Sequence, residues 1–474
     1  SFMQRIKMDS QKKKITIIVS SIIACLLLII AFALFLTFSK KQKEPFNFQE
    51  AFNNINVKSI IVNELDKQLS SKLDDYKLTL EEKDDKTETL AGEDFSLKYY
   101  LSDEAKNLDN INNPLLWVFS VLNPKDSEEE NSLGAGISFN EDLLRNSISN
   151  LSCFQNVIEP KNPSIEYKDG SYVVIDGVIG NKVDSDLLYT SVVNAITKGE
   201  TKINLESLNC YITPKYKADS QEVLNAVDEL NKYSKESITY TIGSNQETLS
   251  CDTIKSWLKV DDDFNVTFNT NDVYGFVNSL ASKYNTVGKA RNFSSSSGGT
   301  VQVSGGVYGW KVNVDGEVES LISAIKNGTQ TKELTFSQKG ATLGDNDIGN
   351  SYVEIDLGRQ HLWLYVDGAL IMDTNIISGN VSKNYTTPAG VYSLYYKQKD
   401  QILRGEDYAT PVSFWMPFNG GIGLHDASWR TAEELANPQT YLTAGSHGCV
   451  NMTYEAAQTI YNNVWAGIPI VCYY

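Results

Sequence analysis

Hydrophobic and polar residues alternate along several segments near the C-terminal end of the chain. In the stretches 353–357 and 361–366, apolar side chains recur at every second position, which is typical of strands with one buried face. The pair Asp367-Gly368 after the second stretch is a hairpin-turn signal. His361 shares the alternation, so we interpret it as a strand residue and not as a catalytic one. These patterns predict a β-rich unit over residues 351–474.

Two further signals refine this unit. Thr453 precedes a helical pattern over 454–461 and can accept a hydrogen bond from the first turn as an N-cap. The apolar run 467–474 contains Cys472, which we interpret as a buried strand residue and not as a metal ligand.

The opposite end of the chain carries a longer apolar run. Residues 15–38 contain no charged side chain, and a helix of these 24 residues would be about 36 Å long, enough to cross a hydrocarbon core of about 30 Å. Lysines flank the run, and the basic excess before it favours an internal N-terminus. We therefore predict a cytoplasmic tail over 1–14, in which Ser1 and Phe2 look like a cloning remnant, and one membrane-spanning helix.

The middle of the chain contains an internal repeat. Each copy has a shared block and, further on, an edge strand, a turn and a helix that ends at glycine, where a left-handed cap is common. The repetition predicts two copies of one α+β domain, over 46–215 and 220–340. In the first copy the acidic stretch 123–134 predicts a loop, and in the second the serine-rich stretch 292–306 predicts a flexible loop. The matching blocks are 76–80 with 238–242, 179–184 with 308–313, and 195–199 with 324–328.

The segment 446–451, Ser-His-Gly-Cys-Val-Asn, carries the strongest chemical signal. It places Cys449 two residues after one histidine, and His425 lies upstream in a chain with only three histidines. A thiol is a weak nucleophile until a base such as imidazole takes its proton, so the pattern indicates acyl transfer through a cysteine thioester. A zinc site would need further ligands, and none of the six cysteines shows the paired C-x-x-C spacing. A purely structural pair stays open at this point.

Residues 446–451 resemble the signature of L,D-transpeptidases, the YkuD-type enzymes that cross-link peptidoglycan. In that signature a histidine and a spacer precede [S/T]-H-G-C, an apolar residue and Asn. The segments 352–370, 378–380 and 386–392 resemble the opening hairpin and the S-G … T-P-x-G segment of the same catalytic domain, in the same order. The spacer is a little longer here than in the family, which predicts a longer loop at 432–441 beside the site.

The resemblance implies a mechanism. Cys449 would attack the carbonyl between the third and fourth residues of a donor stem tetrapeptide and release D-Ala, and an acceptor stem amine would then form a 3→3 cross-link. His425 would be the general base, with its other ring nitrogen held by a backbone carbonyl such as that of Asp426. The residues alone leave His447 open as the base, since positions two apart in a strand share a face. Acylation by carbapenems is implied as well, and neither a cofactor nor a metal is expected.

The neighbours of Cys449 have expected supporting roles. The backbone N–H groups of Gly448 and Cys449 are the predicted oxyanion donors, and Gly448 permits a turn that a side chain would obstruct. Ser446 and Asn451 are expected to fix the loop by hydrogen bonds. The helix predicted at 454–461 begins shortly after the cysteine, where N–H groups favour a thiolate. Candidates for the substrate wall, with ordinary packing as the alternative, are Tyr408, Trp415 and Trp429.

The repeats resemble the peptidoglycan-binding domain that often precedes this catalytic domain in Gram-positive enzymes, through the Y-G-W-x-V block at 308–312. The first copy lacks the tryptophan, and binding to the wall and spacing from the membrane remain equal alternatives. The net charge of −17 argues against a nucleic-acid partner, which would require basic patches. The cysteines do not suggest a disulfide framework, although a Cys153–Cys210 bridge stays an alternative.

Together these observations predict a multidomain, single-pass membrane protein whose C-terminal domains lie in the wall space of a Gram-positive bacterium. A transmembrane helix at 15–38 precedes two α+β repeats and a β-rich L,D-transpeptidase domain at 351–474. The expected partners are donor and acceptor stem peptides of peptidoglycan. An L,D-carboxypeptidase using the same cysteine, or a non-catalytic wall-binding protein, are the alternative functions.

Overall fold

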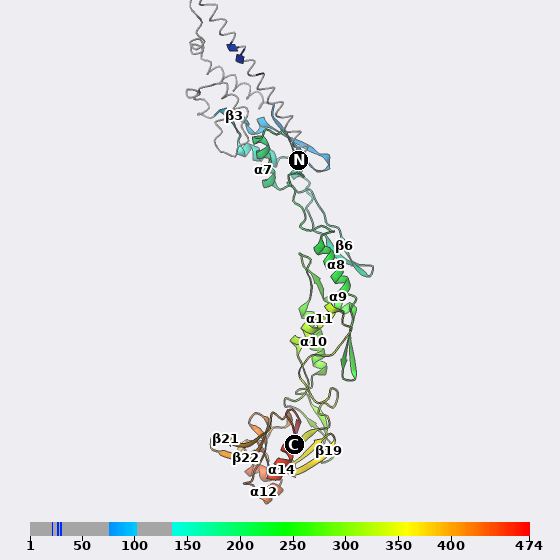
Figure 1. The fold of residues 1–474 in the computed structure, drawn as a ribbon, viewed down its shortest axis with the longest axis vertical. Coiled ribbons are helices and arrows are strands. Elements are labelled where there is room, and N and C mark those ends of the chain that lie inside the picture. The colour runs from blue at the N-terminus through cyan, green and yellow to red at the C-terminus, as the bar shows by residue number, and fades with distance from the viewer. Residues whose placement is uncertain (1–20, 22–25, 28, 31–74, 102–134) are drawn as a thin grey trace, which may run out of the picture. The chain divides into compact units, whose positions relative to one another are not determined.

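The computed structural model describes two compact parts of the chain (Figure 1). One unit comprises residues up to 164 together with 175–218, and the other comprises 165–174 together with 219–474. Nearly all of the predicted membrane segment, the tail before it and the loop predicted at 123–134 lie outside the described residues. Within the part of the chain that is described, no helix combines the length and the apolar character that crossing a bilayer requires. The described residues are 21, 26, 27, 29, 30, 75–101 and 135–474.

The first unit contains the first repeat. Its elements are β1 (Lys77–Glu81), β2 (Thr87–Ala91), β3 (Lys98–Leu101), β4 (Ala135–Ser138), α6 (Glu141–Ser149), α7 (Ser185–Thr197) and β7 (Lys202–Asn204). Strand β1 lies between its antiparallel partner β2 and its parallel partner β7. Alternate residues of β1, Leu78 and Leu80, are fully buried and belong to one hydrophobic core with Leu144 of α6 and Leu188 of α7.

One part of the predicted repeat pattern is wrong in this copy. The edge strand expected at 179–184 is reduced to a single bridge between Val183 and Tyr211. Gly180 explains the difference, because its φ of +73° turns the chain there and a Cβ atom would meet the Ile158 carbonyl oxygen at 2.4 Å. The left-handed glycine predicted after the helix is confirmed, since Gly199 has a φ of +65°.

The second repeat opens the other unit. Its elements are α8 (Gln221–Tyr233), β8 (Ile238–Ile242), β9 (Asn245–Leu249), α9 (Cys251–Trp257), β10 (Leu258–Val260), β11 (Val266–Phe268), α10 (Thr270–Tyr284), β12 (Arg291–Ser294), β13 (Thr300–Val303), β14 (Lys311–Val312), α11 (Val314–Asn327), β15 (Thr331–Lys332) and β16 (Phe336–Gln338). Strand β8 pairs with β9 and with β15, the same order as in the first copy. The predicted glycine cap is confirmed at Gly328, whose φ is +70°. A short hairpin, β5 (Ser164–Lys168) and β6 (Ser171–Ile175), lies within the first repeat in sequence, between α6 and α7, although its residues 165–174 belong to the second unit.

The serine-rich stretch predicted as a flexible loop is instead the β12–β13 hairpin, and it is bonded to the catalytic domain. Ser296 donates its backbone N–H and its hydroxyl to the two carboxylate oxygens of Glu354, at 2.8 Å and 2.5 Å. The hydroxyls of Ser295 and Tyr473 lie 2.7 Å apart. Glu354 is fully buried, so these donors supply the partners that its charge needs. The tertiary contacts therefore order a stretch whose composition alone indicates flexibility.

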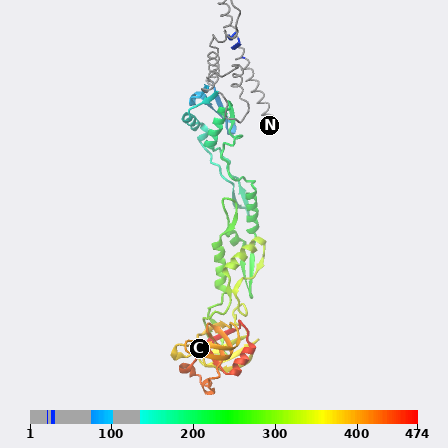
Figure 2. The ribbon, with the colours of Figure 1, turned by 60° about the vertical axis from the view of Figure 1, so that its left-hand side comes forward.

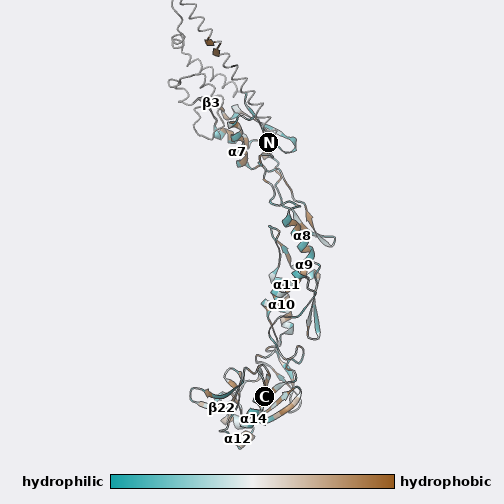
Figure 3. Cartoon of the chain, viewed as in Figure 1, coloured by the Kyte–Doolittle hydropathy of each residue, from teal (hydrophilic) through white to brown (hydrophobic). Residues whose placement is uncertain are grey.

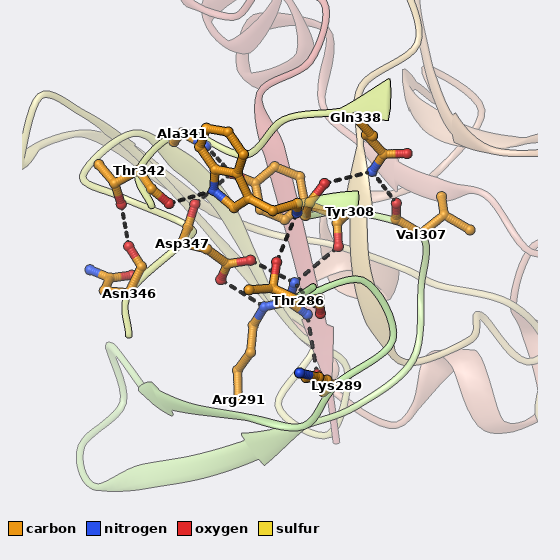
Figure 4. Close-up of polar contacts among 12 residues, drawn as sticks. Thr286, Lys289, Arg291, Val307, Tyr308, Gln338, Ala341, Thr342, Asn346 and Asp347 are labelled. Carbon is orange, nitrogen blue, oxygen red and sulfur yellow. Dashed lines mark hydrogen bonds and ion pairs between the residues drawn. The ribbon is translucent and has the colours of Figure 1, made fainter. Parts of the chain in front are cut away.

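The first residue of this hairpin, Arg291, forms a buried ion pair with Asp347 (Figure 4). Nε and one terminal nitrogen of Arg291 each lie 2.8 Å from a different carboxylate oxygen of Asp347, which is the bidentate geometry typical of strong pairs. The same terminal nitrogen also donates to the Tyr308 carbonyl, and the Tyr308 hydroxyl donates to the Asp347 carbonyl at 2.7 Å. The tyrosine of the Y-G-W-x-V block is therefore buried and makes its hydrogen bonds inside the protein. Its tryptophan, Trp310, likewise donates to the Thr342 carbonyl.

The C-terminal domain consists of two sheets around one core (Figures 1 and 2). A five-stranded sheet has the order β19-β18-β17-β25-β20, and a four-stranded sheet has the order β21-β22-β23-β24. The strands are β17 (Tyr352–Asp356), β18 (His361–Val366), β19 (Ala369–Asn375), β20 (Gly390–Ser393), β21 (Gln398–Arg404), β22 (Ala409–Asn419), β23 (Ile422–Asp426), β24 (Val450–Met452) and β25 (Pro469–Tyr473); the helices are α12 (Ala432–Ala436), α13 (Thr440–Ala444) and α14 (Tyr454–Asn463). Figure 3 shows hydrophobic and hydrophilic residues interspersed along these strands and helices, as expected for elements with one buried face.

Several local predictions for this domain are confirmed. Strands β17 and β18 form the opening antiparallel hairpin, and Asp367 and Gly368 form the next turn with φ values of +51° and +80°. Thr453 caps α14 by accepting a hydrogen bond from the Ala456 N–H. Cys472 is fully buried on β25.

The loop predicted at 432–441 and the alternative of a Cys153–Cys210 bridge both differ from the structure. The segment 432–441 is not a plain longer loop, because it forms α12 and part of α13, and the Thr431 side chain starts α12 with a capping box to Glu434. Cys153 and Cys210 are both free thiols.

Candidate active site

Strands β23 and β24 bring the two candidate catalytic side chains together. They pair in parallel with His425 opposite Asn451, so Cys449, which directly precedes β24, lies beside Gly423, two residues before the histidine on β23. Both side chains line one pocket of about 480 Å³. Its wall is formed by Leu403, Tyr408, Ala409, Thr410, Pro411, His425, Trp429, Arg430, Gly445, Ser446, His447, Cys449 and Asn451.

The orientation of His425 leaves one ring nitrogen available. Nδ1 lies 2.8 Å from the Asp426 carbonyl oxygen, as the sequence predicts. A carbonyl can only accept, so Nδ1 carries the proton of the neutral ring and Nε2 keeps its lone pair. The side chain is 4 % exposed, and this burial lowers the pKa of His425 below its usual 6.5. The imidazole is therefore neutral at pH 7 and able to accept a proton.

The Asp426 carboxylate does not face this ring nitrogen. It accepts hydrogen bonds from the Ser413 and Phe414 N–H groups of β22, at 3.1 Å and 2.8 Å. Two tryptophans flank the imidazole instead, with ring centroids 6.0 Å away for Trp415 and 5.9 Å away for Trp429. The histidine is thus held by a backbone carbonyl and by aromatic packing.

Cys449 lies shortly before the start of a helix, as predicted, but the expected lowering of its thiol pKa is not found. Strand β24 lies between the cysteine and the start of α14 at Tyr454 in the sequence. Burial raises the pKa of the Cys449 thiol to about 11, although a backbone hydrogen bond from Gly423 lowers it in part. Sγ lies 3.5 Å from the Gly421 carbonyl oxygen, the acceptor for its proton. The resting site therefore contains a neutral thiol beside a neutral imidazole.

The turn before the cysteine is held by hydrogen bonds to its own backbone. The Ser446 hydroxyl donates to the Cys449 carbonyl at 2.5 Å and accepts from the Gly448 N–H at 3.0 Å. This confirms the expected role of Ser446, but it occupies one of the two predicted oxyanion donors. Gly448 has a φ of +129° and its Cβ would lie 3.2 Å from the Ile422 side chain, so the requirement for glycine is confirmed.

Two segments that resemble motifs of the family also hold this turn in place by hydrogen bonds. Residues 378–380 pair with Ser446, since the Ser446 N–H donates to the Ser378 carbonyl and the Asn380 N–H donates to the Ser446 carbonyl, each at 2.9 Å. The buried Thr387 hydroxyl donates to the Gly448 carbonyl at 2.6 Å. The motif that contains Thr387 was recognised in the sequence, but no role was predicted for this side chain.

Asn451 holds the loop through its backbone and not through its amide. Its N–H and carbonyl pair with those of Ile377, at 2.9 Å and 3.0 Å. The side chain is 1 % exposed, and its carbonyl oxygen Oδ1 has no hydrogen-bond donor among the described residues. Such an unpaired buried acceptor is uncommon in folded proteins.

The remaining candidates divide by position. His447 is not in a strand and stacks between Tyr385 and Tyr408, with ring centroids 4.7 Å from each. Tyr408 and Trp429 line the pocket, whereas Trp415 is 7 % exposed and lies outside its wall, against His425. Arg430 also lines the pocket, and no sequence pattern indicated it.

A metal-like cluster occurs in the first repeat instead of the catalytic domain. Ligand atoms of Glu82, Glu88 and Cys153 lie within 4.8 Å of one another. Burial first, and then a hydrogen bond to Glu88, raise the pKa of Glu82 to about 7. Two carboxyl groups that share a proton account for this closeness.

Similarity to known proteins identifies the family of this chain. A family model for the L,D-transpeptidase catalytic domain, YkuD, matches residues 350–472. A cysteine-to-serine mutant of an Enterococcus faecium L,D-transpeptidase is 32% identical over an alignment that covers 53% of this chain and 100% of that chain, with a TM-score of 0.45. The chain belongs to the L,D-transpeptidase family.

Further matches concern parts of this L,D-transpeptidase. A model described as "Putative peptidoglycan binding domain" matches residues 101–204 and 216–332, which include most of both predicted repeats. The catalytic domain of an E. faecium L,D-transpeptidase acylated by ertapenem is 34% identical, and the alignment covers 26% of this chain and 98% of that chain, with a TM-score of 0.24. No curated protein matched the chain.

Family membership assigns a peptidoglycan L,D-transpeptidase activity to this chain and makes it a cysteine-dependent acyltransferase. The fold is multidomain, with a catalytic domain at the C-terminal end and repeats before it. The roles of Cys449, His425 and their neighbours rest on the geometry described above.

Proposed function

We propose that this L,D-transpeptidase acts through a thioester on Cys449, with His425 as the general base. The observation that carries the proposal is that both side chains line one pocket while the His425 Nδ1 is held by a carbonyl. The remaining nitrogen, Nε2, is then the proton acceptor on that imidazole. The substrate would be the donor stem tetrapeptide of peptidoglycan.

The proposed reaction has two balanced steps. In the first, the thiol proton passes to Nε2 of His425, sulfur bonds to the carbonyl carbon of the third stem residue, and the bond to D-Ala breaks. The proton then passes to the amine of the leaving D-Ala. In the second step an acceptor amine gives a proton to His425 and attacks the thioester, and the released sulfur recovers a proton as Cys449.

An oxyanion forms in both steps and needs a donor. Among the described residues the Cys449 N–H donates to no backbone acceptor, which supports its assignment. The Gly448 N–H donates to the Ser446 hydroxyl at rest, so it would contribute only after that bond opens.

The experiment is product analysis by mass spectrometry. Residues 46–474 are incubated with disaccharide-tetrapeptide, and we expect a cross-linked dimer that has lost one D-Ala. Tripeptide without dimer would instead favour the L,D-carboxypeptidase alternative, in which water replaces the acceptor amine. No turnover and no carbapenem adduct would contradict the proposal and leave a wall-binding protein. An adduct is expected because a relative's catalytic domain has been acylated by ertapenem.

We also propose that residues 15–38 anchor the chain and that the later domains lie outside the cell. The uncharged length of this run and the lysines before it support the proposal. The full chain should sediment with membranes and lose its catalytic domain to protease added to wall-free cells. A matched chain that starts at residue 46 should stay in the supernatant after lysis. Equal sedimentation of the two chains would contradict the proposed anchor.

The repeats are proposed either to bind peptidoglycan or to hold the catalytic domain away from the membrane. The match to a peptidoglycan-binding model supports binding. The internal bonds of Tyr308 and Trp310 support a structural use of the block that carries the resemblance. Co-sedimentation of residues 220–474 with purified peptidoglycan, compared with residues 351–474, would separate these roles.

A further inference from the structure

Arg430 is a half-buried cation in the wall of the catalytic pocket. Its side chain is 11% exposed, and the residue directly follows Trp429 in the segment after β23. Of the residues that line this pocket, Arg430 alone carries a permanent charge. The pocket therefore offers a single fixed positive charge to whatever enters it.

Most of the hydrogen-bonding capacity of this guanidinium is unused inside the protein. One terminal nitrogen donates to the Ala444 carbonyl at 2.7 Å. The nearest Glu434 oxygen lies 3.8 Å away, and the other accepts from the Thr431 N–H, so this carboxylate does not form a bidentate pair with the guanidinium. Nε is buried without a partner among the described residues. A guanidinium has five N–H donors, and their planar arrangement fits a carboxylate.

The guanidinium shares its pocket with the proposed reacting groups, Cys449 and His425. Ala444, its acceptor, is two residues before Ser446 in the turn that leads to the nucleophile. The positive charge of Arg430 also contributes to lowering the pKa of His425, after the larger effect of burial. A carboxylate on this guanidinium would therefore lie in the same pocket as the nucleophile and the base.

We propose that Arg430 binds the C-terminal carboxylate of the donor tetrapeptide, an inference that rests on the proposed function. That carboxylate belongs to the residue directly after the attacked carbonyl, and successive Cα atoms are only about 3.8 Å apart. In a pentapeptide the carboxylate lies one residue further away and an uncharged peptide group takes its place. Arg430 is thus a specificity-determining residue that selects tetrapeptide donors by their terminal charge.

The test compares donors that differ only at this terminus. The value of kcat/KM is measured for the tetrapeptide acid and for its C-terminal amide, with the wild-type protein, Arg430→Met and Arg430→Lys. We expect the wild type to prefer the acid by roughly 10- to 100-fold. The preference should fall to about 1-fold in Arg430→Met and be partly kept in Arg430→Lys, which retains a charge without the planar donors. Arg404→Met, an exposed arginine on β21 outside the pocket wall, should keep the wild-type ratio.

The outcomes separate this inference from the proposed function. Equal losses on acid and amide in Arg430→Met would show that the side chain only supports the turn through Ala444, and would overturn the proposal. A wild type that turns over both donors equally would overturn it even if the variants do not fold. If the wild type cross-links neither donor, the proposed function fails and this inference fails with it. A carbapenem adduct on Arg430→Met would show that a low ratio does not arise from a damaged nucleophile.

Discussion

Cys449→Ala should abolish both cross-linking and release of D-Ala, with a fall in turnover of at least about 1000-fold. The expected loss is this large because no other described thiol lines the pocket. Without the sulfur no thioester forms, and His425 has no proton to accept from a nucleophile. The measurement is the rate of D-Ala release from tetrapeptide, together with the mass of the protein after incubation with a carbapenem.

Cys251→Ala is the matched control for this variant. Cys251 is an exposed free cysteine in the second repeat, at the start of α9. Its removal should leave both the rate and the adduct unchanged. A carbapenem adduct on Cys449→Ala, or turnover within tenfold of wild type, would show that another group is the nucleophile.

His425→Gln should lower kcat/KM by roughly 100- to 10,000-fold at pH 7 and change the shape of the pH profile. In the wild type, burial holds the pKa of His425 below 6.5. The base is active when unprotonated, so activity should persist through neutral pH and fall only as pH drops through this lowered pKa. The variant depends on thiolate made by solvent, and the thiol pKa is about 11. Its rate should therefore climb about tenfold for each pH unit from neutral towards that value.

The third histidine provides the control for this experiment. His361 lies on β18, outside the pocket wall, and its ring nitrogens contact Asp373 and Asn375. His361→Gln should keep both the wild-type rate and the wild-type profile. His447→Gln can change substrate affinity, since the ring stacks between two tyrosines, but should keep the flat profile at neutral pH. If His447→Gln acquires the steep profile and His425→Gln does not, the two histidines have exchanged roles.

The neutral state of both groups has a consequence for reactivity at rest. A thiol with a pKa of about 11 carries almost no thiolate at pH 7, so general alkylating reagents should react slowly with Cys449. Selectivity then comes from substrate, which has to position its carbonyl before the proton moves to His425. A bound carboxylate on Arg430 would help that positioning.

Local sequence patterns were sufficient for elements whose interactions are close in the chain. The Asp367-Gly368 turn and the Thr453 cap depend on neighbouring residues, and both are as predicted. The burial of Cys472 followed from a short apolar run. Since turn and cap geometry is set within a few residues, it can be recognised without a tertiary structure.

Features that depend on distant partners were missed or misjudged. The serine-rich hairpin is ordered by Glu354, which lies 58 residues after Ser296 in the chain. Trp415 looked like a wall residue, but the pairing of β22 with β23 puts it against His425 and outside the pocket wall. No sequence pattern indicated Arg430, because its importance comes from lining the same pocket as Cys449.

The amino-acid sequence by itself determined which residues are chemically able to act, since the Ser-His-Gly-Cys-Val-Asn segment and an upstream histidine identify a nucleophile and a base. It also determined the family and the repeated architecture. Only the tertiary structure decided the state of the site: a thiol kept neutral by burial, a Gly448 N–H bonded to Ser446, and a cation left partly unpaired in the pocket wall. Burial and hydrogen-bond partners arise from segments far apart in sequence, and they set pKa values and free donors that no local pattern encodes.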